Sequence, residues 1–256
     1  VLNYENVTIS NNNFLNSFAP QGAFLYTKAI QNLVITGNKF EDGRSNDAFV
    51  SINSVVNAEV SQNQFTDSNL KINSQNSILT LGVTNLLIKD SNFYQSRYSS
   101  QSKSAIVVDT SILVSLINLK VNGSTTSVFQ ATAMYIVRCT KVELNNSLIT
   151  FTENAKFYSV HSDNNQNVVI FNTTFENNYR RLLGFNDFNT IYVDSLIFTK
   201  NFEGSPGESV LYFESQAIGK VDLKNMQVYS NSYKSISLMD MLTNSEFVVD
   251  NLTLNN

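Results

Sequence analysis

A short phrase of apolar and polar positions recurs along the whole chain at a spacing of about 26 residues. It reads apolar-x-apolar-x-x-Asn-x-Phe, and its clearest copies begin at Val7, Leu33 and Ala58. Later copies keep the apolar positions and replace the Asn, for example with Ser91 or Thr173. A fixed period of this length is typical of a stacked repeat, in which each unit buries its apolar face against its neighbours.

Each copy of the phrase predicts two short strands joined by a turn. In the copy at 33–40, alternate residues of 33–35 point the same way, as a strand requires. Asn38 suits the turn because Asn tolerates the left-handed backbone conformation. A third strand is expected about ten residues later in each repeat, at 23–26, 48–51, 78–81, 105–108, 134–137, 157–160, 182–185, 210–213 and 236–239.

Three short strands per repeat predict an all-β fold, a right-handed parallel β-helix of about ten rungs. With strands about 4.8 Å apart, the rod would be roughly 45–50 Å long. Asn12, Asn38 and Asn63 would stack as an amide ladder, each side chain bonding to the one above. The leucine-rich repeat is the main alternative, but it needs a Leu-x-x-Leu-x-Leu spacing and segments with a helical period, which we do not find.

The repeat extends over residues 1–256, which predicts one domain without a linker. Neither end of the sequence contains a polar turn that would cap a solenoid, so we expect a segment of a longer polypeptide. The segment between the second and third strands varies in length and is rich in Ser, as at 66–77, 94–104 and 199–209. Variable polar loops on one edge are where such a rod would carry a function.

The third strands contain adjacent apolar residues, which cannot all point inward along a straight strand. Two interpretations remain open. Either the chain turns a corner there and buries both residues, or one apolar column faces outward and forms a docking stripe. The residues of this stripe would be Phe24, Phe49, Ile78, Ile106, Phe157 and Val210.

Composition narrows the classes of partner. The net charge is -4 and charged residues are 15% of the chain, so solubility rests on Asn, Ser and Thr more than on charge. The absence of a Lys/Arg-rich run argues against nucleic acid. No apolar stretch approaches the roughly 18 residues of a membrane helix, so this segment is expected to lack a membrane span.

Five Asn-x-Ser/Thr sequons are candidates for glycosylation in the secretory pathway: Asn6, Asn122, Asn145, Asn172 and Asn251. A chain this rich in Asn, Ser and Thr also makes sequons by chance, and Asn122 falls within a copy of the repeat phrase. Cys139 is the only cysteine, so no internal disulfide forms.

The repeat phrases resemble those of the pectate-lyase-like family throughout the chain. That resemblance implies a parallel β-helix, and in its enzymes the cleavage of polysaccharides. The Asn-Thr-Asp, Asp-Asp, Gly-His-Gly and Arg-Ile-Lys motifs of polygalacturonase-like members do not occur here, nor does an adjacent carboxylate pair. We therefore expect no catalytic residue, metal ligand or cofactor. The alternative that stays open is a cluster of Asp residues from equivalent positions of neighbouring rungs.

The remaining candidate groups for chemistry are few. His161, the only histidine, follows a predicted strand and is expected to be a solvated turn residue without a metal-binding partner. A Ser nucleophile would need a base that the chain otherwise lacks. Arg180 and Arg181 form either a solvated pair or a grip for a carboxylate.

These observations predict a structural or interaction segment of a large extracellular or cell-surface protein. It resembles the β-helical surface proteins and adhesins of bacteria and protists, which implies a rigid rod in a filament, coat or adhesive assembly. Its partners would be other protein subunits, further β-helix segments of the same chain, or glycans.

The alternative is a carbohydrate-binding or polysaccharide-degrading β-helix with its groove along the third strands. Carboxylates with Lys or Arg on the outer face of these strands would favour the enzyme, whereas Phe, Ile and Val would favour protein docking. The contact candidates for a sugar are Tyr26, Tyr212, Arg180, Arg181, Lys103 and Arg97.

Overall fold

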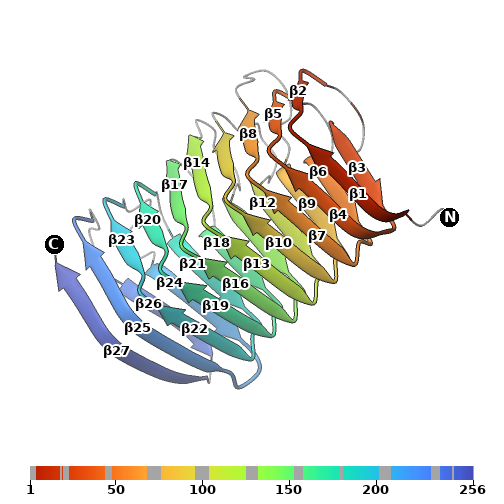
Figure 1. Ribbon diagram of the computed structural model, residues 1–256. Coiled ribbons are helices and arrows are strands. Elements are labelled where there is room, and N and C mark those ends of the chain that lie inside the picture. The colour runs from red at the N-terminus through yellow and green to blue at the C-terminus, as the bar shows by residue number, and fades with distance from the viewer. Residues whose placement is uncertain are drawn as a thin grey trace.

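A computed structural model describes residues 4–17, 19, 23–43, 48–67, 76–95, 104–124, 132–152, 158–178, 181–201, 209–231, 237–243 and 245–255. In these residues the chain is an all-parallel β-helix with no helical segment (Figure 1). The strands of successive turns lie side by side from one end of the rod to the other. The predicted fold class is therefore confirmed.

Each turn contributes one strand to each of three ladders of parallel strands. The first ladder contains β1 (Tyr4–Ser10), β4 (Ile30–Thr36), β7 (Asn57–Ser61), β10 (Asn85–Lys89), β13 (Leu113–Ile117), β16 (Lys141–Asn145), β19 (Asn167–Phe171), β22 (Thr190–Asp194), β25 (Lys220–Tyr229) and β27 (Glu246–Asn255).

The second ladder contains β2 (Asn13–Leu15), β5 (Lys39–Glu41), β8 (Gln64–Asp67), β11 (Asn92–Gln95), β14 (Lys120–Ser124), β17 (Leu148–Thr152), β20 (Thr174–Glu176) and β23 (Ile197–Thr199), and continues in the second halves of β25 and β27. The third ladder is a nine-stranded sheet of β3 (Leu25–Lys28), β6 (Ala48–Asn53), β9 (Asn76–Leu81), β12 (Ile106–Asp109), β15 (Met134–Val137), β18 (Tyr158–Asp163), β21 (Arg181–Asn186), β24 (Ser209–Ser215) and β26 (Ser237–Thr243).

The number of fully stacked turns is smaller than predicted. About seven turns, from β4–β6 to β22–β24, have three separate strands and a neighbour on both sides. At the C-terminal end the first and second strands merge into the single strands β25 and β27. The prediction of about ten rungs counted every copy of the repeat phrase. Only the inner turns, however, have three separate strands and a neighbouring turn on both sides.

The turn between the first and second strands differs in detail from the prediction. The left-handed residue is the one before the Asn of the phrase, for example Asn11 (φ 57°), Gly37 (φ 66°) or Gln62 (φ 56°). Asn38 itself is buried and serves the turn through its side chain. At these positions Asn contributes its side-chain hydrogen bonds and not a left-handed backbone conformation.

The expected amide ladder is present inside this turn. Asn12 Nδ2 donates to Asn38 Oδ1 over 3.1 Å, and Asn38 Nδ2 donates to Asn63 Oδ1 over 3.1 Å. The same Oδ1 of Asn63 accepts the backbone N–H of Asn38, and Asn63 Nδ2 donates to the carbonyl of Ile35. The column then changes to Ser91, whose hydroxyl oxygen accepts the backbone N–H of Asn63. Buried backbone groups that a tight turn leaves unpaired are satisfied in this way.

A second buried amide ladder was not expected from the sequence. Asn178 Nδ2 donates to Asn201 Oδ1, and Asn201 Nδ2 donates to Asn231 Oδ1, each over 3.0 Å. These residues follow the second strand at its far end. The spacing Phe-x-x-Asn at Phe175 and Phe198 is the signal that would have identified it.

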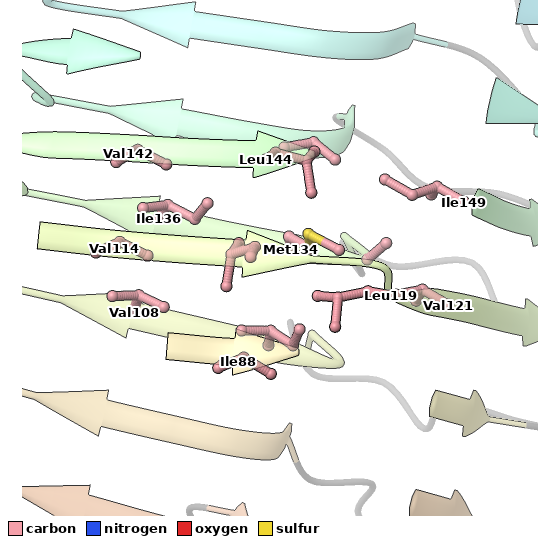
Figure 2. Packing of buried hydrophobic residues seen from close by; sticks show 14 of the residues in the cluster. Ile88, Val108, Val114, Leu119, Val121, Met134, Ile136, Val142, Leu144 and Ile149 are labelled. Atoms are coloured by element: carbon pink, nitrogen blue, oxygen red, sulfur yellow. The ribbon is translucent and has the colours of Figure 1, made fainter. Parts of the chain in front are cut away.

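Columns of like side chains fill the interior between the ladders. Phe14, Phe40, Phe65 and Phe93 stack with ring centroids 4.8–4.9 Å apart. Figure 2 shows aliphatic side chains of the first and third ladders meeting in the middle of the rod, such as Val114 and Ile136. Each turn thus buries its apolar face only against its neighbours and its own opposite strands.

The predicted docking stripe does not form. Phe49, Ile78, Ile106 and Val210 are at most 2% exposed, Phe24 is half-buried against the core, and Phe157 lies outside the described residues.

The register shows why these residues do not share one face. Val50, and not Phe49, pairs with Ile78, so the proposed residues belong to two different columns. Phe49 and Val50 are both buried within β6, as the corner interpretation expects. At Ile78-Leu79 and Ile106-Val107 only the first residue is buried, and Leu79 and Val107 lie half-buried on the outer side of the sheet. Neither interpretation therefore holds for every turn.

The buried and the exposed amide ladder allow a matched test of how much buried side-chain hydrogen bonds stabilise the fold. An exposed ladder runs through Asn6, Asn32, Asn57 and Asn85, with Nδ2–Oδ1 distances of 2.8–2.9 Å. Asn63→Ala should lower the free energy of unfolding by about 3 kcal/mol, because it leaves buried groups of Asn38 and Ile35 unpaired.

The control Asn57→Ala should cost only about 0.5 kcal/mol, since water replaces its lost partners. Urea denaturation followed by circular dichroism measures both variants. Equal losses for the two would contradict a special role for the buried ladder.

Candidate binding face

The outer surface of the nine-stranded sheet collects the side chains with the most chemical variety in the described chain. We call this surface the third-strand face. It has two outward columns, defined by strand register. The first column contains Tyr26, Ser51, Leu79, Val107, Tyr135, His161, Gly184 and Tyr212; the second contains Lys28, Asn53, Leu81, Asp109, Val137, Asp163, Asn186 and Glu214.

An aromatic cluster occupies the C-terminal half of this face. The ring of His161 lies 5.3 Å from that of Tyr135 and 5.0 Å from that of Tyr158, which in turn lies 5.7 Å from that of Tyr212. Tyr158 covers Gly184, where an added Cβ would lie 2.6 Å from the tyrosine ring. The missing side chain of Gly184 therefore makes the space in which Tyr158 packs.

Two tyrosines of the face are paired with carboxylates. The hydroxyl of Tyr135 donates to Asp163 Oδ2 over 3.2 Å, and that of Tyr212 donates to Glu214 Oε2 over 2.8 Å. Burial, and then the nearby Asp163 carboxylate, raise the pKa of Tyr135 above its ordinary value. The Tyr135 hydroxyl thus stays protonated at neutral pH and holds the Asp163 carboxylate beside its ring.

One carboxylate of the face is neutralised by an arginine. Arg138 donates from Nε to Asp109 Oδ1 over 2.8 Å and from its terminal guanidinium nitrogen to Asp109 Oδ2. This two-point contact raises the pKa of the exposed Arg138 guanidinium. Within the described ranges, Asp163 and Glu214 form no ion pair, so their charges give this face an acidic character.

His161 does not lie in a solvated turn, as the sequence predicted. It belongs to β18 and is half-buried between Tyr135 and Tyr158. Its Nε2 is buried and has no hydrogen-bond partner among the described residues. Burial lowers the pKa of His161, and the nearby Asp163 opposes that shift only in part. The prediction failed because strand β18 extends three residues beyond its apolar part.

The third-strand face matches neither the pattern of carboxylates with Lys or Arg that would favour an enzyme nor the apolar pattern that would favour protein docking. It combines half-buried aliphatic residues, Leu79 and Val107, with tyrosines and carboxylates. Of the predicted sugar contacts, Tyr26 is 44% exposed on β3 and Tyr212 is half-buried in the cluster. Arg97, Lys103 and Arg180 lie outside the described residues, and the side chain of Arg181 is likewise not described.

The predicted glycosylation candidates fall at different places on the rod. Asn6, Asn122, Asn172 and Asn251 are exposed, whereas Asn145 is half-buried with a buried Oδ1 that lacks a partner in the described chain. Asn122 is not a ladder residue: it faces outward on β14, beside Tyr94 of the preceding turn. The sequence alignment of that repeat was shifted because Leu119 occupies the ladder position.

Other groups with potential chemistry are isolated. In the described ranges, no three His, Cys, Asp or Glu residues lie together in a way that would hold a metal ion. Cys139 is buried, and burial raises its pKa to about 11. In the part of the chain that the structure describes, no helix has the length and hydropathy of a membrane span.

Comparison with known proteins gives no relative from which a function would transfer. No family model matches the chain, and no curated protein matches it.

The environment of His161 predicts a pH-dependent stability. The unfolded side chain has a pKa of about 6.5, and the folded one a lower pKa. Below pH 6.5 the unfolded state therefore binds a proton that the folded state does not. Stability should fall as the pH is lowered, by up to about 1.4 kcal/mol per pH unit, until the folded pKa is reached.

His161→Gln should remove this part of the pH dependence of stability between pH 7.5 and 5.5. Because the chain has no other histidine, the difference between the two proteins reports on His161 alone. Urea unfolding of both proteins at the two pH values measures it. An identical pH dependence in the variant would show that His161 does not titrate differently on folding.

Proposed function

We propose that this chain is a rigid β-helical rod that serves as a structural and interaction segment of an extracellular or cell-surface assembly, such as a filament, a coat or an adhesive layer. The observation that carries the proposal is the uninterrupted stacking of all three ladders along the described chain. Every inner turn is bonded to the turns before and after it, which is what a spacer under load requires.

The interior supports stiffness. The stacked Phe14, Phe40, Phe65 and Phe93 rings and the buried amide ladders extend across several turns without interruption. Bending the rod would separate these stacked groups on one side and compress them on the other, and close-packed interiors resist both. A rod of this kind keeps the residues on its surface at fixed spacings.

The surface is compatible with a place outside the cell. Four of the five sequons present exposed Asn side chains: Asn6, Asn122, Asn172 and Asn251. Ion pairs such as Lys39–Glu41 and Lys89–Glu59 are partly exposed, so they add little to stability. The fold depends instead on backbone pairing and apolar packing, which salt does not screen.

Localisation and assembly can be tested on the native protein. An antibody against this chain should label intact, unpermeabilised cells of the source organism or material that they secrete. The extracted protein should also migrate in gel filtration as an assembly larger than the single chain. Labelling that appears only after permeabilisation would contradict the extracellular role, and an exclusively monomeric protein would contradict the assembly.

A second candidate function is the binding or degradation of a polysaccharide along the third-strand face. The Tyr135–Asp163 and Tyr212–Glu214 pairs favour it, because an aromatic ring supports the apolar side of a sugar while a carboxylate accepts from its hydroxyls. Tyr135 and Tyr212 lie three strands apart, about 14 Å along the rod.

This second candidate predicts that Tyr135→Ala and Tyr212→Ala each weaken polysaccharide binding about tenfold, equivalent to ~1.4 kcal/mol. Tyr94→Ala is the matched control, since Tyr94 is exposed on the second ladder, away from this face. Affinity electrophoresis through gels containing neutral or acidic polysaccharides measures retardation, and a reducing-sugar assay measures cleavage. A protein that neither binds nor cleaves any of them would eliminate this candidate.

A further inference from the structure

We propose that Asn172 carries an N-linked glycan and that the sugar chain lies in the groove beside it, on the turn between the first and second ladders. The inference rests on the proposed secretory location. It goes further by selecting one sequon and by assigning an occupant to a groove.

The groove runs along the rod over four consecutive turns. It has a volume of about 550 Å³ and is lined among others by Asp90, Asn118, Lys120, Asn146, Leu148 and Asn172. Four turns correspond to about 14 Å between the first and last strand. A volume of this size holds a small organic ligand, and therefore also the first few rings of a glycan.

Asn172 is placed at one end of this groove. It is the left-handed residue of its turn, with φ 45°, and its side chain is exposed. The sequon Asn172-Thr173-Thr174 continues into β20, and Thr174 also lines the groove. A sugar attached to Asn172 therefore begins inside the groove and needs no change of the backbone to enter it.

The hydrogen bonding of Asn172 is compatible with the modification. Its Nδ2 donates one hydrogen to Asn146 Oδ1 over 2.6 Å, which leaves the second hydrogen for substitution. In the transfer, Nδ2 forms a bond to C1 of an activated glycosyl donor as the C1–O bond to a diphosphate leaving group breaks. The amide releases one proton and keeps the other for Asn146.

The lining matches a neutral, hydroxyl-rich chain. Asn118 donates to Asp90 Oδ1 over 2.6 Å, and among the described residues Asn118 Oδ1 and Asn146 Nδ2 have no hydrogen-bond partner. They present an acceptor and a donor to sugar hydroxyls. Leu148 supplies an apolar surface for a ring face, and the charges of Asp90 and Lys120 cancel, so the groove favours an uncharged occupant.

Two other exposed sequons serve as references because their residues do not line this groove. Asn122 faces outward on β14, and Asn6 belongs to the exposed amide ladder of β1. A glycan on either residue would extend into solvent, where an enzyme reaches it freely.

The first measurement is site-resolved glycopeptide mass spectrometry on the native protein. Asn172 should carry a glycan. An unmodified Asn172 beside an occupied Asn6 or Asn122 would overturn the inference and leave the extracellular proposal intact. A protein bare at all sequons would overturn the inference, and the surface labelling described above would then decide separately about the extracellular role.

The second measurement tests the groove, on the full chain secreted from a eukaryotic host. Under native conditions an endoglycosidase should release the Asn172 glycan about tenfold more slowly than the glycans of Asn6 and Asn122, because docking shields it. Leu148→Arg, which fills the groove, should abolish the difference. Leu87→Arg is the matched control, since Leu87 is a half-buried outer residue of β10 that does not line this groove. Equal release rates in the unmodified sequence would overturn the docking of the glycan.

Discussion

The in-register hydrogen bonding of each turn to the next is the constraint on which the rest of this structure depends. It continues even through the turns: the left-handed residues Asn11, Gly37 and Gln62 each donate a backbone N–H to the following turn. Because every residue is fixed opposite its equivalent, a side chain always has the same two neighbours in its column. A buried polar residue is therefore tolerated only where its column supplies a partner, as Asn38 and Asn63 do for each other.

The same constraint explains the separation between interior and surface. Interior columns stay apolar although their residues change in size. Phe40, Phe65 and Phe93 stack ring on ring, and the same column then passes through Val121 and Ile149 to Phe175. Outward columns also change in polarity from turn to turn, from Leu79 to Val107 to Tyr135 on the third-strand face. Specific recognition is therefore expected where unlike outer residues become neighbours, as in the cluster around His161.

Both candidate surfaces arise from this combination of a fixed frame and variable outer residues. On the third-strand face, a missing side chain at Gly184 admits Tyr158, which then contacts His161 and Tyr212. At the turn, one groove is lined by the left-handed residues Asn118, Asn146 and Asn172. Neither surface needs an insertion or an extra domain, which fits a rod whose contacts are distributed along its length.

The sequence by itself determined the fold class, the three strands of each turn and the amide ladder of Asn12, Asn38 and Asn63, because the apolar residues and the Asn recur with the same period. It did not determine whether two adjacent apolar residues are both buried, as Phe49 and Val50 are, or whether one faces outward, as Leu79 does. Nor did it place His161 against Tyr158 and Tyr135, or join Asn118, Asn146 and Asn172 in one groove. These contacts join residues of different turns, and the lengths of the intervening segments vary. Only the register of the folded ladders decides which side chains become neighbours.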